Sequence, residues 1–552
     1  MIANYWIKFW GCLALVTLTS ILAGPAHAIV DMKGANYSDT WTDLEISMKS
    51  DRWAVERTYN SRSLFNGIFG FGWCSSWETT LKVNGTGQIK VTECGGGSET
   101  VYNAPNFDIQ GEMTSQIDLI STEVRRLRPD LTEKYIENLR AELRVNDFMR
   151  EEFLRRMGAS YYPLFSTTYV SSDMRSSVIF NGRQFTRVQG YGRTEVFDDQ
   201  GRLKRQKTSG GRWITLSYRD NKPVRVSHED GPYLDLVYRE DTAKIAKIKS
   251  SEGSEVNYVI NFDDLREFTD PSGERVGYDY DSTHNLTRIN FSDGSYKALT
   301  YNLEKDWVLS YRNRKGCVES YTYSLSADDP KNHFWSDVIK HCEGKTTNQS
   351  RYEFFHTFGD NGLIYLKAEK FIVNGAVTQF HFDQLGRPIE VERGDRVTFL
   401  SYDPLGRLVL VERADQVEER AYDSSCEGAT FLERVRRDPV EVNSRVWIAK
   451  IKYSSLCQIL RLDRSDGVHL SFSYIGTGKV KIIDENGFAA TFDYSYGDPS
   501  RPSRIEINDF PPWEIRWTDQ GEMELTEPTR PGADKANLAL EKITGSLPLN
   551  EE

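Results

Sequence analysis

The chain has 552 residues, with 69 Lys plus Arg against 81 Asp plus Glu, a net charge of -12 and an isoelectric point near 5.4. With 39% hydrophobic and 27% charged residues, 41 Gly and 18 Pro, a collagenous chain and disorder throughout are excluded. The acidic balance argues against a general nucleic-acid or anionic-membrane binder, because those partners reward surfaces rich in Lys and Arg. Aromatic residues make up 12%, and Tyr and Phe far outnumber Met, which favours an all-β protein.

The amino terminus, residues 1–28, has the pattern of a secretory signal. One basic residue, Lys8, precedes an apolar run from Phe9 to Ala23, and Ala26-His27-Ala28 forms a cleavage site before Ile29. An uncleaved anchor is the alternative, since the apolar run is almost long enough to span a bilayer. The small residues at 26 and 28 serve signal peptidase and have no role in an anchor. We therefore predict an exported protein (periplasmic, cell-surface or secreted) with no membrane span after cleavage.

Six cysteines lie beyond the signal, and an even number in an exported protein is typical of disulfides. They fall into three pairs that are local in the sequence, and we predict the disulfides Cys74 with Cys94, Cys317 with Cys342, and Cys426 with Cys457. Six unpaired thiols are the alternative, which an oxidising compartment disfavours. No Cys-x-x-Cys motif is present and the eight His are scattered, so we expect no metal site and no cofactor.

From about Glu112 to Gly158 the pattern changes to that of helices. The apolar spacing from Ile117 to Leu127 is helical until a proline interrupts it. Asp130 with Glu133 has the pattern of a capping box and predicts a second helix. A third helix is expected to begin near Asn146 and to end at the glycine that closes the segment. We expect an amphipathic insert packed on the sheet; a partner-binding or plug element is the alternative.

Beyond the helices, the chain carries a repeat of about twenty-one residues. Each unit contains an aromatic residue that closes a short β-like run. In several units an acidic or polar turn with Gly and then an apolar strand follow, as in Phe197-Asp198-Asp199-Gln200-Gly201-Arg202-Leu203. A strand, a tight turn and a strand cannot bury an apolar face alone, so neighbouring units must stack. We predict structural roles for the anchor aromatics: Phe197, Tyr218, Tyr238, Tyr258, Tyr280, Tyr301, Tyr323, Phe382, Tyr402, Tyr422, Tyr453, Tyr474 and Tyr494.

These units resemble the RHS/YD-repeat family, whose signature is Tyr-Asp followed after two residues by Gly-Arg-Leu. The best matches are the segments Tyr402 to Leu408, Phe382 to Arg387 and Phe197 to Leu203. A second resemblance lies upstream, where Arg57-Thr58-Tyr59-Asn60-Ser61-Arg62 and Phe69-Gly70-Phe71-Gly72-Trp73, preceded by Asp43-Leu44-Glu45-Ile46, look like the amino-terminal module that opens the array in RHS proteins.

The resemblance implies a spiralling strip of antiparallel sheet, which in large family members winds into a hollow shell around a carboxy-terminal toxin or enzyme. A parallel β-helix is the alternative, but turn signals beside each aromatic favour hairpins. We therefore expect an all-β strip or partial shell with a small α-helical insertion. The expected segments are a signal peptide at 1–28, an amino-terminal RHS-type module at 29–111, a helical insertion at 112–158, the continued module at 159–190, a YD-repeat array at 191–510, and a terminal strand and tail at 511–552.

No catalytic site is predicted. Paired carboxylates such as Asp198-Asp199 and Asp263-Asp264 fall at turns, and neither G-x-S-x-G nor H-E-x-x-H is present. The D-x-N-G segment that starts at Asp484 is interpreted as a turn rather than a calcium site. Large RHS proteins end in a self-cleavage signature and an effector. We expect neither autoproteolysis nor a toxin payload here, because that signature is missing from Phe510 to Glu552.

These observations favour an exported, non-enzymatic scaffold at the cell envelope or outside the cell that recognises a protein or a glycan. One alternative is a partial shell that encloses a separately encoded cargo or toxin. Another is a secreted carbohydrate-active enzyme whose groove follows the repeat axis. Exposed aromatics along one face would favour glycan binding, an enclosed polar lumen would favour cargo, and two close carboxylates would favour hydrolysis.

Overall fold

The computed structural model describes residues 29–47, 52–84, 87–94, 98–105, 108–158, 166–171, 175–189, 193–208, 211–240, 242–359, 364–422, 428–436, 444–454, 458–475, 479–484, 487–493, 504–507, 512–517 and 523–526. These residues form antiparallel β-sheet with three α-helices, which confirms the expected all-β fold with a small helical insertion. The parallel β-helix alternative is wrong. The chain divides into two compact units, residues 1–75, 208–212 and 230–552, and residues 76–207 and 213–229.

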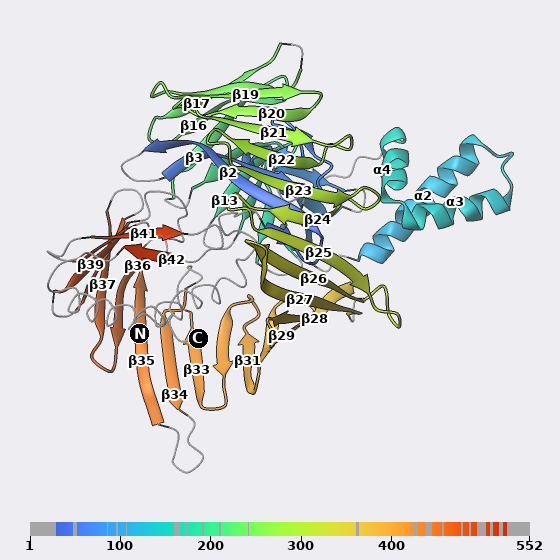
Figure 1. Ribbon diagram of the computed structural model, residues 1–552. Coiled ribbons are helices and arrows are strands. Elements are labelled where there is room, and N and C mark those ends of the chain that lie inside the picture. The colour runs from blue at the N-terminus through green and yellow to red at the C-terminus, as the bar shows by residue number, and fades with distance from the viewer. Residues whose placement is uncertain are drawn as a thin grey trace. The chain divides into compact units, whose positions relative to one another are not determined.

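The first unit combines short amino-terminal strands with a long strip in which each strand pairs with its neighbour in the chain (Figure 1). The amino-terminal strands are β1 (Ile29–Asp31), β2 (Asn36–Ser47), β3 (Arg52–Asn60), β4 (Asn66–Gly67), β5 (Gly70–Phe71) and β6 (Trp73–Cys74). The strip contains β17 (Tyr233–Tyr238), β18 (Ile245–Ser250), β19 (Glu255–Asn261), β20 (Asp264–Thr269), β21 (Arg275–Tyr280), β22 (Leu286–Phe291), β23 (Tyr296–Asn302), β24 (Trp307–Arg312), β25 (Val318–Leu325), β26 (His333–Cys342), β27 (Lys345–Phe358), β28 (Ile364–Val373) and β29 (Ala376–Phe382). It continues with β30 (Pro388–Arg393), β31 (Arg396–Tyr402), β32 (Leu408–Glu412), β33 (Gln416–Ala421), β34 (Phe431–Arg436), β35 (Ser444–Tyr453), β36 (Ile459–Arg464), β37 (His469–Ile475), β38 (Lys479–Asp484), β39 (Ala489–Asp493), β40 (Arg504–Ile507), β41 (Trp513–Trp517) and β42 (Met523–Thr526).

A register shift immediately precedes many of the repeat aromatics. In β31 the pairing with β32 shifts between Ser401 and Tyr402, and the same shift occurs before Tyr280, Tyr301 and Phe382. A β-bulge of this kind adds one unpaired residue and changes the direction of nearby side chains. The bulge therefore recurs at the end of the strand at which the anchor aromatic sits.

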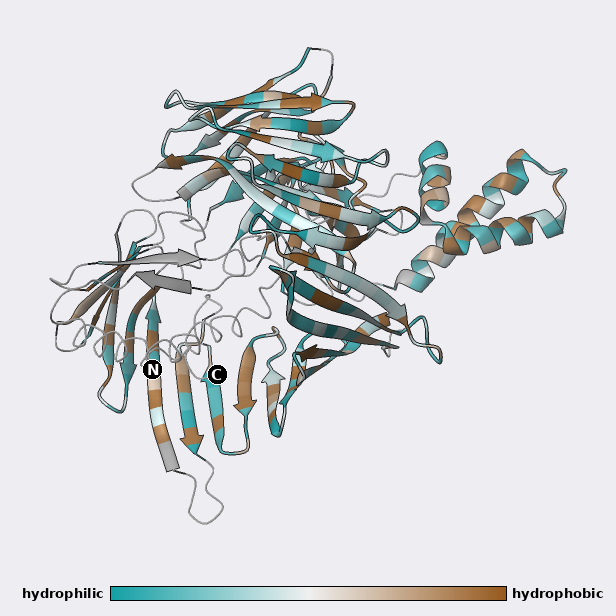
Figure 2. Ribbon diagram, viewed as in Figure 1, coloured by the Kyte–Doolittle hydropathy of each residue, from teal (hydrophilic) through white to brown (hydrophobic). Residues whose placement is uncertain are grey.

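Alternate residues along the strands of the strip form its core (Figure 2). In β37 and β38 the buried residues Leu470 and Ile482 each alternate with more exposed neighbours, as the period of two in a strand requires. The described core of the last third of the strip consists of Ala429, Leu432, Trp447, Ala449, Ile451, Leu462, Leu470, Ile482, Ala490, Phe492, Ile505 and Ile507.

The second unit is a shorter run of consecutively paired strands with the helices inserted in it. Its strands are β7 (Thr80–Val83), β8 (Ile89–Thr92), β9 (Glu99–Asn103), β10 (Thr168–Ser171), β11 (Ser177–Phe180), β12 (Gln184–Val188), β13 (Thr194–Asp198), β14 (Leu203–Lys207), β15 (Trp213–Arg219) and β16 (Lys222–His228), preceded by the 3-10 helix η1 (Ser76–Glu78). The helices leave the sheet after β9 and the chain returns to pair β10 with β9, Ser171 lying opposite Tyr102. The insertion is thus an excursion between two adjacent strands.

The three helices are α2 (Ile109–Leu127), α3 (Glu133–Val145) and α4 (Asp147–Arg156), and they pack on one another (Figure 1). Their shared core contains Ile117, Ile120, Leu139, Leu143 and Leu154. Among the residues that the structure describes, no helix is long and apolar enough to cross a membrane. The predicted signal at residues 1–28 lies outside the described residues.

The predicted start of α4 agrees with the structure, whereas α2 begins at Ile109, before the predicted Glu112, and the predicted cap of α3 differs. Asn146 caps α4 by accepting a hydrogen bond from the Met149 N–H at 3.0 Å, as the predicted start requires. The predicted capping box of Asp130 is wrong: Thr132 is the N-cap of α3, and Asp130 instead pairs with Arg128. Asp130 lies two residues before the cap, because Glu133 is the first helical residue and not the third, as a capping box requires.

Candidate functional site: the repeat signature and the amino-terminal junction

The aspartate of the repeat signature holds the turn that follows each anchor. Asp403 Oδ1 accepts hydrogen bonds from the backbone N–H groups of Leu405 (2.9 Å) and Arg407 (2.8 Å), and its Oδ2 accepts one from Arg407 Nε at 2.7 Å. Gly406 has φ +79°, a left-handed conformation that glycine adopts without strain. Asp383 and Asp198 make the corresponding contacts in their own units.

The arginine of the signature joins one repeat to the next. The Arg407 guanidinium carbon lies 4.6 Å from the ring centre of Tyr422, the anchor of the following unit. Arg387 lies 5.1 Å from the Tyr402 ring in the same way. A guanidinium that pairs with the turn carboxylate while it covers an aromatic face combines an ion pair with a cation–π contact. The Tyr-Asp and Gly-Arg halves of the signature therefore stabilise a turn and a junction between units.

The tyrosine hydroxyl also joins neighbouring units, through a hydrogen bond to the backbone. Tyr402 Oη donates to the Pro388 backbone carbonyl at 2.7 Å, and Tyr422 Oη donates to that of Leu408 at 2.7 Å. In each case the acceptor is the first residue of the strand that follows the preceding anchor. Analogous bonds to a backbone carbonyl are made by Tyr218, Tyr301, Tyr323, Tyr453 and Tyr474. These tyrosines thus have structural contacts, and the predicted anchor Tyr494 lies outside the described residues.

Two anchors are used differently, because the amino-terminal strands pack against them. Tyr258 Oη donates to Asp43 Oδ2 at 2.7 Å, and Tyr280 Oη accepts a hydrogen bond from Trp73 Nε1 at 2.8 Å. Both partners belong to segments singled out for their resemblance to the RHS amino-terminal module. Here the amino-terminal module replaces the neighbouring repeat as the partner of the anchor.

A buried ion pair forms the centre of this junction. Arg57 on β3 donates from Nε to Asp43 Oδ2 at 2.7 Å, and neither side chain is exposed. The Arg57 Nη2 atom donates to Tyr278 Oη at 2.6 Å, and the guanidinium carbon lies 4.3 Å from the Trp73 ring centre. The junction therefore joins the amino-terminal strands to β19 and β21 through charge, hydrogen bonds and aromatic faces.

The electrostatics of the junction keep the arginine charged. Burial lowers the pKa of Arg57, but the Asp43 carboxylate together with Tyr278 and Tyr258 outweighs burial and holds that pKa above its ordinary value. Burial raises the pKa of Asp43, and the hydrogen bonds from Arg57 and Tyr258 oppose the rise. Burial and the nearby carboxylate raise the pKa of the Tyr258 hydroxyl, so that it remains a donor. The cluster is suited to holding two segments together; its buried groups are closed to a substrate.

Further contacts extend the junction along the strip. Lys297 Nζ lies 3.0 Å from Asp39 Oδ2, and Ser336 Oγ donates to the backbone carbonyl of Met32. The backbone N–H of Leu286 donates to Tyr59 Oη at 2.9 Å. The amino-terminal strands thus cover one face of the strip from β19 to β26.

Beyond the cover, aromatic side chains continue on the same face. The ring centres of Tyr352 and Phe371 are 5.3 Å apart, those of Phe371 and Phe380 are 5.5 Å apart, and those of Phe380 and Phe382 are 6.4 Å apart. We call Tyr352, Phe371, Phe380 and Phe382 the aromatic row. Phe380 is buried, whereas the other three are half-buried in the part of the chain that the structure describes. The row therefore leaves three half-buried aromatic side chains on this face that a ligand could contact.

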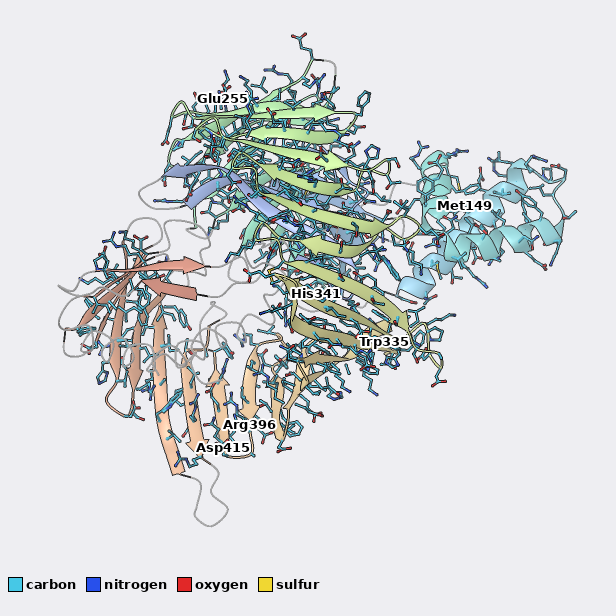
Figure 3. All side chains as sticks on the ribbon, viewed as in Figure 1. Met149, Glu255, Trp335, His341, Arg396 and Asp415 are labelled. Atoms are coloured by element: carbon cyan, nitrogen blue, oxygen red, sulfur yellow. A yellow bond between two sulfur atoms is a disulfide. The ribbon has the colours of Figure 1, made fainter. Side chains whose placement is uncertain are left out.

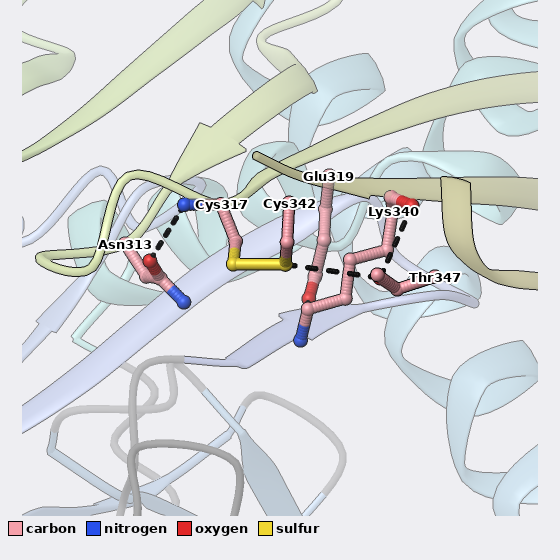
Figure 4. Close-up of a disulfide and its surroundings, with 6 residues drawn as sticks. All are labelled: Asn313, Cys317, Glu319, Lys340, Cys342 and Thr347. Atoms are coloured by element: carbon pink, nitrogen blue, oxygen red, sulfur yellow. Dashed lines mark hydrogen bonds and ion pairs between the residues drawn. A yellow bond between two sulfur atoms is a disulfide. The ribbon is translucent and has the colours of Figure 1, made fainter. Parts of the chain in front are cut away.

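The cysteines were the other predicted site residues. Cys317 and Cys342 form a disulfide between the start of β25 and the end of β26 (Figure 4). The Cys317 N–H donates to Asn313 Oδ1 at 3.0 Å, and Thr347 Oγ1 lies 3.7 Å from Cys342 Sγ. Cys74 and Cys94 are each disulfide-bonded. The predicted pair Cys426 and Cys457 lies outside the described residues.

The ion pair of Asp43 and Arg57 was not predicted from sequence. Both residues lie in the motifs that carried the amino-terminal resemblance, but nothing in their spacing indicates that they meet or that Tyr258 and Tyr278 join them from 200 residues downstream. Of the carboxylates interpreted as turn residues, Asp198 accepts the Arg202 N–H of its turn at 2.9 Å, whereas Asp264 is the buried first residue of β20 and contacts Arg266 and His284.

A family model described as RHS Repeat matches residues 262–296, and a model described as a domain of unknown function (DUF6531) matches residues 28–101. No curated protein matched.

Among solved structures, TcdB2-TccC3-TEV is 11% identical with a TM-score of 0.35, and a Photorhabdus luminescens Tc holotoxin pore is 10% identical with a TM-score of 0.34. Each alignment covers 91% of this chain and 28% of the other, so the chain spans less than a third of the length of these proteins. Likenesses at this level carry no functional argument. With an RHS repeat matched at residues 262–296 and the Tyr-Asp and Gly-Arg unit recurring along its strands, the chain is an RHS/YD-repeat protein.

Proposed function

We propose that the protein is an exported, non-enzymatic RHS-repeat scaffold that binds a protein partner through the aromatic row. The carrying observation is that one face of the strip is covered from β19 to β26 by a polypeptide of its own, while Tyr352, Phe371 and Phe382 on the continuation of that face are half-buried. Half-buried aromatic side chains gain free energy when a partner covers them, at roughly 25 cal/mol per Å² of apolar area.

The chemistry of the covered part favours a polypeptide over a glycan. There aromatic side chains of the amino-terminal strands pack on the strip, as Trp41 does on Phe291 with ring centres 5.9 Å apart. Backbone N–H groups of the strip donate to carbonyls of the module, as Val308 does to Ala35 at 3.1 Å. A partner that resembles the module would make the same two kinds of contact. A separately encoded cargo is the second candidate, since an extended cargo chain would use the same row.

The enzyme alternative has less support from the geometry. The polar residues of the repeat signature contact turns and neighbouring strands, as Asp403 and Arg407 do. The fully buried Asp43 carboxylate is paired with Arg57 and closed to solvent. These contacts favour a scaffold role for the residues that an acid–base mechanism would need.

The test uses the purified full chain after signal cleavage and three probes: an unfolded polypeptide (reduced, carboxymethylated lactalbumin), a glycan array and a panel of hydrolase substrates. We expect the polypeptide to bind, and binding to weaken at least tenfold in Phe371→Ser. The control is Phe399→Ser, because Phe399 is a 49% exposed aromatic that pairs with Glu390 on the opposite face. Glycan binding without polypeptide binding would overturn the partner class, and reproducible turnover would overturn the non-enzymatic assignment.

Export is tested separately by sequencing the amino terminus of the protein recovered from outside the cytoplasm. The expected first residue is Ile29, directly after the A-x-A site. A retained Met1 would indicate an anchor instead and would contradict the export proposal in its present form.

A further inference from the structure

A cluster of metal-ligating side chains on the strip lies outside the junction and the aromatic row. It lies on β29 and β30, where His381 pairs with Glu390 and Gln379 pairs with Glu392 in the antiparallel register. Directly paired residues share a face of the sheet, so these four side chains lie on the face opposite Phe380 and Val391. Figure 3 labels Arg396, which begins β31, the strand that follows β30.

The ligand atoms in this cluster converge. A histidine nitrogen and one carboxylate oxygen each from Glu390 and Glu392 all lie within 4.8 Å of one another. His381 Nε2 is 3.6 Å from Glu392 Oε1. A tetrahedral Zn²⁺ with ligand bonds of about 2.05 Å holds neighbouring ligand atoms ~3.4 Å apart. Small rotamer changes in Glu390 and Glu392 would therefore bring all three atoms to bonding distance.

The contacts of the histidine leave a nitrogen for a metal. Gln379 Nε2 lies 2.8 Å from His381 Nε2, so a metal bound at that nitrogen would replace the contact with Gln379. Among the residues that the structure describes, Glu390 makes no ion pair or hydrogen bond through its side chain. One imidazole and one carboxylate without another described partner thus face each other across two strands.

We propose that His381, Glu390 and Glu392 form a binding site for a divalent transition-metal ion of the Zn²⁺ class. Imidazole and carboxylate together suit Zn²⁺ and its neighbours better than Ca²⁺ or Mg²⁺, which take oxygen ligands alone. Three protein ligands leave the fourth tetrahedral position open to water or to a group from a partner. The histidine side chain is 27% exposed and that of Glu392 is 42% exposed, so the ion can enter from solvent.

A second histidine in the strip, His333, contacts a single carboxylate and has no third ligand nearby among the described residues. His333 Nε2 lies 2.8 Å from Glu353 Oε1 across β26 and β27, and it also stacks on Phe355 with ring centres 4.3 Å apart. That imidazole is bonded to a single carboxylate and joins none of the described groups of three ligands. The pair of His333 and Glu353 is therefore a matched control on the same sheet.

The experiment measures Zn²⁺ binding to the full, metal-free chain by competition with a chromophoric chelator, after alkylation of any free thiols so that cysteine cannot bind the probe. We expect one equivalent of Zn²⁺ to bind, and His381→Ala and Glu390→Gln each to weaken binding at least tenfold. Gln379→Leu should leave binding equal or tighter, because it removes the donor that competes for His381 Nε2.

The control variants His333→Ala and Glu353→Gln should leave Zn²⁺ affinity unchanged. Circular dichroism of each variant checks that the sheet is intact, and Co²⁺ substitution supplies a second readout, since d–d absorption reports nitrogen and oxygen ligation directly. Absence of Zn²⁺ binding by the folded chain overturns the proposal. Equal losses in the control and cluster variants, or no loss in His381→Ala and Glu390→Gln, overturn it as well.

Discussion

The covered part of the strip and the open repeats use the same sequence position in different ways. In the open repeats, Tyr402 and Tyr422 donate their hydroxyl groups to backbone carbonyls of the preceding unit. In the covered part, Tyr258 donates to Asp43, and Tyr280 accepts from Trp73. The repeat thus determines the position of the tyrosine ring, and the segment packed against the ring determines the hydrogen-bond partner of its hydroxyl group. An anchor position can therefore serve the array in one place and the amino-terminal module in another.

The turns show the same contrast. Gly201 and Gly406 occupy the same signature position and have φ of +74° and +79°. A Cβ at Gly201 would lie 1.7 Å from the Leu81 carbonyl oxygen, whereas a Cβ at Gly406 would meet nothing within 4 Å. The Leu81 N–H also donates to the Gly201 carbonyl at 2.9 Å. Where another strand contacts the turn, glycine is required for two reasons: the positive φ and the lack of room for a Cβ.

The largest effect is expected at the junction. Asp43→Ala leaves the fully buried Arg57 guanidinium without its carboxylate, and removing one partner of a buried ion pair costs about 3 to 5 kcal/mol of unfolding free energy. Chemical denaturation measures the loss. Asp463→Asn is the control, because its partner Arg461 is half exposed and such pairs contribute about 1 kcal/mol or less. A loss at Asp43 no larger than that at Asp463 would remove the distinction between covered and open regions.

The two signature glycines sharpen the comparison at the turns. Gly201→Ala should cost about 3 kcal/mol or more, because the clash is with backbone that cannot move aside. Gly406→Ala should cost about 1 kcal/mol, which is the conformational strain alone. Thermal denaturation of both variants gives the difference. Equal losses would mean that the approach of β7 does not constrain the turn.

The tyrosine hydroxyl of an open repeat should contribute less. Tyr402→Phe keeps the ring beneath Arg387 and removes one hydrogen bond to the Pro388 carbonyl, which corresponds to about 1 kcal/mol. Tyr258→Phe should cost more, because it removes a donor from the buried Asp43. Equilibrium unfolding in urea decides between them. A larger loss at Tyr402 than at Tyr258 would reverse the ranking of open and covered anchors.

The smallest effect concerns pH. Burial raises the pKa of Glu369 to about 7, with Lys33 lowering it and Asp31 raising it. Because the folded value lies above the unfolded one of about 4.3, the stability from neutral Glu369 is complete below pH ~4.3 and is lost as pH rises through 7. Glu369→Gln should therefore flatten the dependence of Tm on pH between ~4.3 and 7. An unchanged slope would show that burial does not keep Glu369 neutral in the folded protein.

The sequence predicted most of the repeat architecture, because its signals are local. The anchor spacing follows from strand and turn lengths, and Asp403, Gly406 and Arg407 complete their contacts within a few residues of one another or with the next unit. The predicted start of α4 at Asn146 was also correct. The cap of α3 was wrong because Asp130 and Thr132 both precede Glu133 and offer capping side chains, and only the backbone geometry distinguishes them.

The amino acid sequence alone determined the period, the hairpin class, the helical insertion and the RHS/YD-repeat family, since each depends on residues close together in the chain. Tertiary structure decided which anchors meet the amino-terminal module, that Asp43 and Arg57 are paired beneath it, and that His381 faces Glu390 and Glu392. These contacts depend on strand register and on segments as far apart as Arg57 and Tyr278, and a one-residue slip would place the same side chains on opposite faces. The local sequence pattern cannot indicate which units the amino-terminal strands cover, because the same anchor aromatics occur in the covered part and in the open repeats.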